Sequence, residues 1–370
     1  MRISETVAPP SIVPLSLRST LRDVAIQTLG ATGRLSAVKR AIARRGDIVV
    51  LTLHRIVPDD EVTLCRSPRG MVLRESLFRQ LIQYLTEDAT VVSPGHTSRL
   101  STIGSRPKVL LSFDDGWIDN ALIAKPILSQ ACMLACFFVV TSLVGTIAPF
   151  WPEQMVSLLT CLRANSKLSQ LQPLLDELSV ARHSPRVPCA DEVLLTWLKT
   201  INTDQLKKFL GRASSLVRDS GTASNTISCD DPKERLMTWE QIEGLISAGH
   251  LVGSHTKTHA LLPLLDHRSL MDELAGSRYL LQERLAGNKN DSMWLSYPNG
   301  SSNPTVTLAA FETGYRNAFS TSVGTWSRSA DPLLIPRVNV WDGSVADSNG
   351  RFSPDHADYA LFWRSGYENS

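Results

Sequence analysis

Seven short apolar runs alternate with helical segments along this chain of 370 residues, and the alternation restricts the fold more than any other feature. Each run is rich in Val, Ile, Leu, Phe or Tyr at consecutive positions, which is typical of a parallel strand buried on both faces. Repetition of strand, helix and strand predicts an α/β fold. The predicted strands are Ile48–His54, Val109–Phe113, Ala135–Thr141, His250–Ser254, Met293–Tyr297, Ala318–Thr321 and Leu334–Val340.

The segments between these runs include helices with recognisable ends. Thr238 and Gln241 form the two halves of a capping box ahead of an apolar stripe, and Gly249 is suited to the end of that helix. Residues 150–235 break the alternation, because they are leucine-rich and helical with Ser and Pro interruptions. They predict a helical subdomain inserted into the α/β domain.

The charge is unevenly distributed although the totals nearly cancel. Lys and Arg number 38 against 36 Asp and Glu, a balance that argues against a protein that coats a polyanion such as nucleic acid. Residues 1–46 hold eight basic and two acidic residues, which leaves 30 basic against 34 acidic residues and a charge of −4 for the rest. The basic segment predicts a helical extension that packs on the body, and peripheral contact with a membrane surface is the alternative.

These patterns predict three parts: the extension over 1–46, a main domain over 47–345 with the insert at about 150–235, and a C-terminal tail over 346–370. The length fits one large domain with an insert better than two independent domains. No run approaches the roughly 18 apolar residues of a membrane helix. Prolines interrupt any apolar stretch near the start, so we expect no signal peptide and a cytoplasmic location.

The sharpest local signal is the sequence Leu-Ser-Phe-Asp-Asp-Gly-Trp at 111–117. Asp114 and Asp115 follow a predicted strand, and adjacent side chains of a strand point to opposite faces. Both carboxylates share one site only where the strand gives way to a turn, which Gly116 permits. Active sites collect at the carboxyl ends of parallel strands. The alternative is a solvent-facing turn.

Two further motifs follow predicted strands. His255 and His259 lie four residues apart, a spacing at which two imidazoles bind one metal ion. Together with a carboxylate from another strand end they form a two-His, one-Asp set with open positions, for which zinc is the default ion. In the third motif, Tyr-Pro-Asn-Gly at 297–300, the turn places backbone N–H groups where they can face a developing oxyanion.

In their order and spacing, these three motifs resemble the polysaccharide deacetylases with a NodB homology domain, carbohydrate esterase family four. The resemblance covers about residues 48–342 outside the helical insert. Supporting phrases lie at Thr52–Arg55, Pro126–Leu128, Phe137–Val139, Gly314–Tyr315 and Leu334–Arg337.

The resemblance implies a distorted (β/α) barrel and metal-dependent hydrolysis of an acetamido group on a sugar. It implies that Asp115, His255 and His259 bind the metal ion and that Asp114 is the general base. The cation lowers the pKa of water and polarises the carbonyl, while the neighbouring carboxylate takes the proton. The backbone N–H of Asn299 is the expected second oxyanion donor.

Two positions depart from the family pattern. Many members have an arginine, which tethers the catalytic Asp, where this chain has Ser296; Arg337 is a candidate replacement, and a structural ion pair is the other interpretation. The late Leu-x-His that supplies the general acid has no match. His54, at the end of the first strand, is the candidate acid, and capping of that strand by hydrogen bonding is the alternative.

Aromatic side chains near the predicted loops are candidates for stacking on a sugar, although a large aromatic at a loop more often serves local packing. Tyr297 and Trp117 are the predicted substrate contacts, and further candidates are Trp151, Trp326 and Trp341.

The leading hypothesis is a metal-dependent N-deacetylase acting on a polysaccharide, an oligosaccharide or a glycan precursor. Three alternatives stay open: a deacylase or amidase acting on a non-sugar amide, a carbohydrate-binding protein of low activity, and an adaptor that binds membranes or nucleic acid through residues 1–46. The expected partner is a carbohydrate, and the sequence is silent on oligomeric state.

Overall fold

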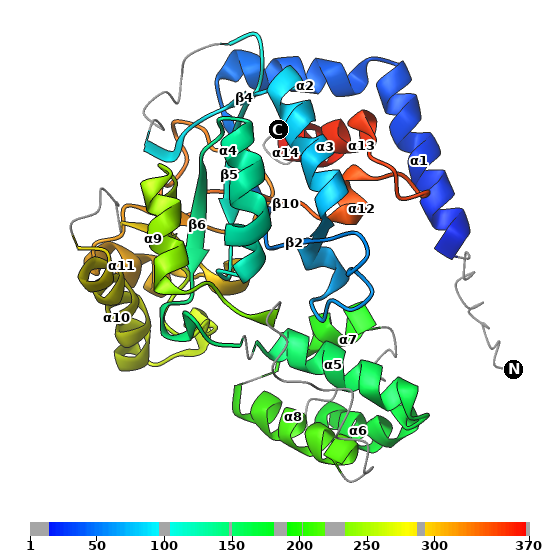
Figure 1. Cartoon of the computed structure of the whole chain (residues 1–370), viewed down its shortest axis with the longest axis vertical. Helices are drawn as coiled ribbons and strands as arrows, with labels where there is room; N and C mark the ends of the chain where they lie inside the picture. Colours follow the sequence, from blue (N-terminus) through cyan, green and yellow to red (C-terminus); the bar gives the residue numbers. More distant parts are fainter. Residues whose placement is uncertain are drawn as a thin grey trace, which may run out of the picture.

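A curved parallel sheet wrapped by helices forms the centre of the molecule in the computed structural model (Figure 1). The structure describes residues 15–95, 104–147, 150–180, 191–201, 203–218, 234–286 and 293–367. The strands are β1 (Ile48–Leu53), β2 (Arg55–Val57), β3 (Val72–Arg74), β4 (Thr90–Val91), β5 (Lys108–Phe113), β6 (Ala135–Val139), β7 (Leu251–Ser254), β8 (Trp294–Ser296), β9 (Asn317–Phe319) and β10 (Val338–Asn339).

The helices lie outside the sheet or in the insert. The α-helices are α1 (Leu15–Ala31), α2 (Arg34–Arg45), α3 (Glu75–Asp88), α4 (Lys125–Gln130), α5 (Trp151–Ala164), α6 (Gln172–Val180), α7 (Asp191–Leu198), α8 (Thr203–Arg218), α9 (Trp239–Ser247), α10 (His267–Arg284), α11 (Pro304–Glu312), α12 (Asp342–Val345), α13 (Pro354–Asp358) and α14 (Arg364–Tyr367). Single 3-10 or π turns are η1 (Arg69–Met71), η3 (Asn120–Ala124), η4 (Thr141–Leu143), η5 (Leu168–Leu171), η7 (Leu262–Leu264), η8 (Pro298–Gly300) and η9 (Tyr359–Trp363).

The main sheet has the strand order β10-β1-β5-β6-β7-β8-β9, and β4 pairs with the start of β5. Every paired neighbour is parallel. A parallel bridge between Phe319 and Ile335 joins β9 to the segment that continues into β10, and Val338 of β10 pairs with Leu51 of β1. The sheet therefore curls almost completely round, and the predicted α/β fold with a distorted (β/α) barrel is confirmed.

Both faces of the central strands are buried, which explains their continuous apolar runs. Along β1, Val49, Leu51 and Leu53 belong to a cluster shared with the helices α3, α4 and α9. The alternate residues Ile48 and Val50 belong to a second cluster, with side chains from β5, β6, β8 and β9 inside the barrel. Strand residues two apart share a face, so one run supplies two apolar layers.

The predicted capping box at the start of α9 is present. Thr238 Oγ1 accepts a hydrogen bond from the backbone N–H of Gln241, and the Gln241 side chain accepts one from the Thr238 N–H. The strand predictions differ from the structure in two respects. The strand predicted at Leu334–Val340 is confined to two residues, because Pro336 has no N–H for a ladder. The short strands β2, β3 and β4 were not predicted.

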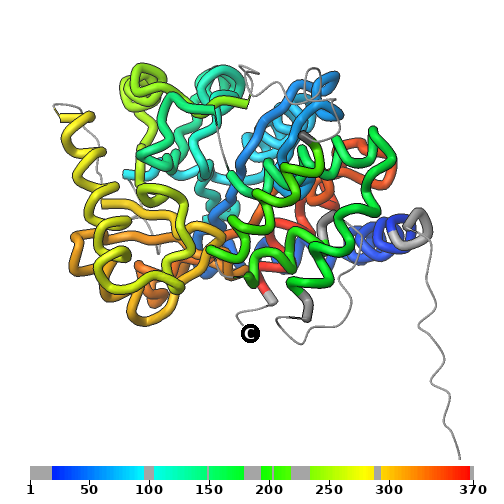
Figure 2. Tube along the Cα trace, turned by 90° about the horizontal axis from the view of Figure 1, so that it is seen from below, coloured from blue at the N-terminus to red at the C-terminus, as the bar shows by residue number. Residues whose placement is uncertain are grey.

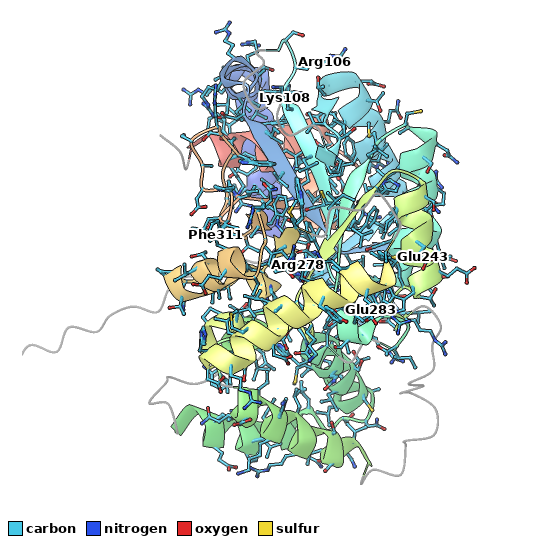
Figure 3. All side chains as sticks on the ribbon, turned by 90° about the vertical axis from the view of Figure 1, so that its left-hand side faces the viewer. Arg106, Lys108, Glu243, Arg278, Glu283 and Phe311 are labelled. Carbon is cyan, nitrogen blue, oxygen red and sulfur yellow. The ribbon has the colours of Figure 1, made fainter. Side chains whose placement is uncertain are left out.

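The helices α5–α8 form a separate lobe with an apolar core of its own, built from residues between Met155 and Val217. Figure 1 shows this lobe beside the barrel, and Figure 2 shows the same helices, in green, from below. The two ends of the lobe meet in a bridge between Ile147 and Arg235, and Leu236 bridges to Trp117 just after β5. The lobe is thus anchored to the loop at the carboxyl end of β5. Lys108, at the other end of that strand, lies on the side of the molecule away from the lobe (Figure 3).

Helix α2, near the start of the chain, packs against helices near its end. Leu35 and Ile42 of α2 are buried, and Ala357, Leu361 and Phe362 near the C-terminus belong to the main core. The region predicted as a tail thus contains helices packed against α2 as far as residue 367. Residues 1–14 of the predicted extension and 368–370 of the predicted tail lie outside the described residues. Among the helices that are described, none has the length and apolarity needed to cross a bilayer.

Candidate active site

Asp114 and Asp115 lie where β5 gives way to a turn, as the motif predicts. Asp115 has a φ of 73°, in the left-handed region, and Gly116 follows with a φ of 83°. A Cβ atom at Gly116 would lie 3.1 Å from a methyl carbon of Val139, so glycine suits both the conformation and the space. Both carboxylates are buried, with only 3% of each residue exposed.

Three side chains from two strand ends converge beside this turn. Asp115 Oδ1 lies 3.3 Å from His255 Nε2 and 3.6 Å from His259 Nε2. One ligand atom from each of the three residues lies within 4.8 Å of the other two. The loop after β7 that carries the histidines bends sharply, since Thr256 and His259 have φ values of 65° and 64°. Among the described residues, this trio is the group suited to hold a metal ion.

Contacts around the trio favour metal binding. His255 Nδ1 lies 2.8 Å from the carbonyl oxygen of Ser296, which accepts the Nδ1–H and leaves the Nε2 lone pair facing Asp115. Trp117 Nε1 donates to Asp115 Oδ2 at 3.1 Å and leaves Oδ1 facing the histidines. Two imidazole nitrogens and one carboxylate oxygen in this arrangement fit a divalent ion such as zinc.

Asp114 is held by a buried arginine. Arg337 Nη1 and Nη2 donate to Asp114 Oδ1 and Oδ2 at 2.9 and 2.8 Å. Ser296 Oγ donates to Asp114 Oδ2 at 3.1 Å and accepts from Arg337 Nη2 at 2.9 Å. Arg337, 1% exposed, thus occupies the tethering position for which the sequence made it a candidate. Burial alone would raise the pKa of Asp114, but the charge and hydrogen bonds of Arg337, together with the charges of His255 and His54, outweigh it and lower that pKa.

His54 lies close enough to Asp114 and Asp115 to interact electrostatically with both carboxylates. Burial lowers the pKa of His54, and the charges of Asp115 and Asp114 offset only part of that effect. Its Nδ1 atom is buried and has no hydrogen-bond partner among the described residues. The imidazole is therefore neutral near pH 7.

Tyr297 and Trp117, predicted as substrate contacts, present no surface to a substrate in this structure. Both are 0% exposed. Tyr297 belongs to the apolar layer between the sheet and the helices α10 and α11. Trp117 is covered by Arg55, whose guanidinium carbon lies 4.0 Å from the ring centroid. Trp117 instead positions Asp115.

The remaining predicted residues occupy different environments. Asn299 has a φ of 53° in a tight turn, where Gly300 N–H donates to the Tyr297 carbonyl at 2.8 Å. Trp326 lies inside the barrel and is 4% exposed. Trp151, at the start of α5, and Trp341 are half-buried.

A buried ionic cluster beneath Trp117 was not predicted. Arg55 Nε donates to Asp119 Oδ2 at 2.6 Å, and its Nη1 donates to Glu234 Oε2 at 3.1 Å and to Ser67 Oγ at 3.1 Å. Arg55 belongs to a phrase that supported the family resemblance, but its partner Glu234 is 179 residues away in the chain. Through Arg55 and Trp117, the cluster connects Glu234, at the end of the helical lobe, to Asp115.

The sequence model described as polysaccharide deacetylase matches residues 200–318, a span that contains His255, His259 and Asn299. Over this span the chain resembles a polysaccharide deacetylase domain. The match agrees with the hydrolase of the polysaccharide deacetylase type that the motifs predict. Asp114 and Asp115 precede the matched span.

Two solved structures have a similar fold. One is the Streptococcus pyogenes deacetylase PplD in complex with acetate, with 17% identity over 85% of this chain and 97% of that chain and a TM-score of 0.51. The other is IcaB from Ammonifex degensii, with 18% identity over 86% of this chain and 97% of that chain and a TM-score of 0.50. Identities this low support the fold. None of the curated proteins compared with the chain matches it.

Proposed function

We propose that this protein is a metal-dependent deacetylase that removes an N-acetyl group from an amino-sugar-containing substrate, such as a polysaccharide, an oligosaccharide or a glycan precursor. One observation carries the proposal: the ligand atoms of Asp115, His255 and His259 converge beside a second carboxylate, Asp114, that is held by Arg337. Binding a carbohydrate without hydrolysis requires neither a ligand trio nor a tethered base.

Each residue has a defined role in the proposed reaction. Asp115, His255 and His259 would hold a divalent ion, which we propose to be zinc; such an ion supplies Lewis acidity and acidifies water when bound. Asp114, ionised because Arg337 lowers its pKa, accepts a proton from the attacking water. The backbone N–H of Asn299 is proposed to donate to the developing oxyanion.

The sequence-based division of the chain also stays a proposal, with its extension, its barrel with the inserted lobe, and its C-terminal region. The separate apolar core of the lobe supports it. We further retain as proposals the cytoplasmic location and a peripheral membrane contact through residues 1–46.

The test measures acetate release from a panel of N-acetylated amino sugars and oligosaccharides, together with the bound metal. We expect Asp114→Asn to lose at least about 100-fold in kcat while it retains metal, since general base catalysis contributes about 10²–10⁴-fold. We expect His255→Ala to lose both metal and activity. Asp60→Asn and His267→Ala, at exposed positions, are the matched controls.

Two results would contradict the proposal. One is a wild-type protein that binds no divalent metal and releases no acetate from any sugar. The other is metal binding that survives His255→Ala unchanged, because the proposed trio would then not be the metal site.

A further inference from the structure

Glu153, in the first turn of α5, has a buried carboxyl group with no well-aligned hydrogen-bond partner among the described residues. The residue is 4% exposed, and a contact with Ser67 lowers its pKa only in part. Buried polar groups are almost always paired, and an unpaired one destabilises the folded state. A carboxyl group retained at such a cost in a protein interior calls for a partner that arrives with a ligand.

The helical lobe places Glu153 against the candidate active site. Phe150, three residues earlier, packs its ring against His259 at 4.9 Å and against Trp117 at 5.5 Å between centroids. The start of α5 therefore lies over the metal-ligand trio. Glu153 is nevertheless outside the group whose ligand atoms lie within 4.8 Å of one another. It adjoins the site without joining the trio.

The surroundings of Glu153 favour its protonated form. Burial, and then the negative charge of Asp115, raise its pKa to about 8, and Arg55 of β2 offsets part of this effect. Lys199, which follows α7, also interacts electrostatically with Glu153. At neutral pH the carboxyl group therefore carries a proton, whereas His54 is a neutral imidazole and the late histidine of the family pattern is absent.

We propose that Glu153, contributed by the inserted helical lobe, is the general acid that protonates the leaving nitrogen of the amide. This inference rests on the proposed function. As the bond between the carbonyl carbon and nitrogen breaks, its electron pair stays on nitrogen, and the Glu153 proton joins that nitrogen to give the free amine. Glu153 is left as a carboxylate and recovers a proton from solvent. Asp114 releases to solvent the proton that it took from water.

The test compares an amide with an ester whose leaving group needs no proton. Glu153→Gln keeps the size of the side chain but removes the acid. We expect kcat for acetate release from an N-acetylglucosamine oligosaccharide to fall at least about 100-fold. We expect hydrolysis of para-nitrophenyl acetate, which releases a stable phenolate, to stay within about twofold of wild type, with unchanged metal content. Glu177→Gln, an exposed position in the same lobe, is the matched control and should affect neither reaction.

The pH profile gives a second readout. Wild-type kcat on the amide should fall on the alkaline side as Glu153 loses its proton, and Glu153→Gln should lack this limb. Equal losses on the amide and the ester, or no loss on either, would overturn the role of Glu153. A wild-type protein inactive on every sugar amide would overturn both the proposed function and the role of Glu153. If the wild type is active and Glu153→Gln is fully active too, only the role of Glu153 is overturned.

Discussion

Asp115 is held by its backbone and its side chain at once. Its φ of 73° lies in a region that non-glycine residues rarely occupy, and strained residues of this kind concentrate at functional sites. The hydrogen bond from Trp117 fixes one carboxylate oxygen, and the stacked Arg55 fixes the Trp117 ring. Partners of metal ligands set ligand orientation, so the indole is expected to contribute to metal affinity although it does not contact the ion.

Replacing Trp117 with Phe tests this contribution. The phenyl ring keeps most of the packing under Arg55 but cannot donate to Asp115, so we expect metal affinity to fall about 10- to 100-fold. Metal titration of the purified variant, with circular dichroism to verify the fold, measures the change. Trp239→Phe, on α9, should bind metal like the wild type. Equal affinities for Trp117→Phe and wild type would show that the hydrogen bond is dispensable.

At the scale of elements, α10 fixes the loop that carries the two histidines. Glu273 of α10 accepts hydrogen bonds from the backbone N–H groups of Lys257 and Thr258 at 3.0 and 2.9 Å, and from Thr258 Oγ1 at 2.5 Å. One buried carboxylate thus satisfies three donors in a loop with two left-handed residues. The loop owes its shape to a neighbouring helix as well as to its own sequence.

We therefore expect Glu273→Ala to weaken metal binding by at least about tenfold, because the loop loses the carboxylate that holds it. Metal titration is the measurement. Glu283→Ala on the same helix is the control, since Glu283, labelled in Figure 3, is exposed. An unchanged metal affinity in Glu273→Ala would mean that the loop keeps its conformation without the hydrogen bonds to Glu273.

The elements also show what a sequence can and cannot predict here. The carboxyl-end motifs were found because each follows a run long enough to be recognised as a strand. The two-residue β4 and the three-residue β2 and β3 are too short to show a pattern. The orientation of Tyr297 follows from alternation: Ser296 contacts Asp114 inside the barrel, so the next side chain points outward. The Arg55–Glu234 pair and the burial of Glu153 depend on how the lobe docks, which no local pattern encodes.

At the scale of the whole molecule, helix α1 and the C-terminal region around α13 are joined by a buried polar contact. Asp23 of α1 accepts the backbone N–H of Ser348 at 2.8 Å and lies 2.9 Å from His356 Nε2 of α13. Burial alone would raise the pKa of Asp23, but the hydrogen bonds from Ser348 and His356 outweigh it and lower that pKa. A carboxylate with a lowered pKa in the folded state stabilises the fold above its unfolded pKa, and this contribution is lost as the pH falls through the folded value.

We expect Asp23→Asn to reduce the free energy of unfolding by about 1–3 kcal/mol at pH 7, and to have a smaller effect at strongly acidic pH, where the wild-type carboxylate is itself becoming protonated. Urea denaturation at the two pH values measures the difference. Asp88→Asn, whose side chain is 48% exposed, should cost less than about 1 kcal/mol. A deficit of equal size at both pH values would contradict the assignment of a charge-dependent contact.

The closure of the barrel by Ile335 and Val338 has a consequence for synthesis of the protein. Arg337 lies between these two residues, and it reaches the site only when the last strand pairs with the first. Its partner Asp114 is 223 residues earlier in the chain. A ribosome adds about 5–20 residues per second, so Asp114 leaves the exit tunnel roughly 10 seconds or more before the guanidinium that neutralises it. During that interval the nascent chain carries a carboxylate destined for burial without its counter-charge, and chains terminated after β9 would lack Arg337 altogether.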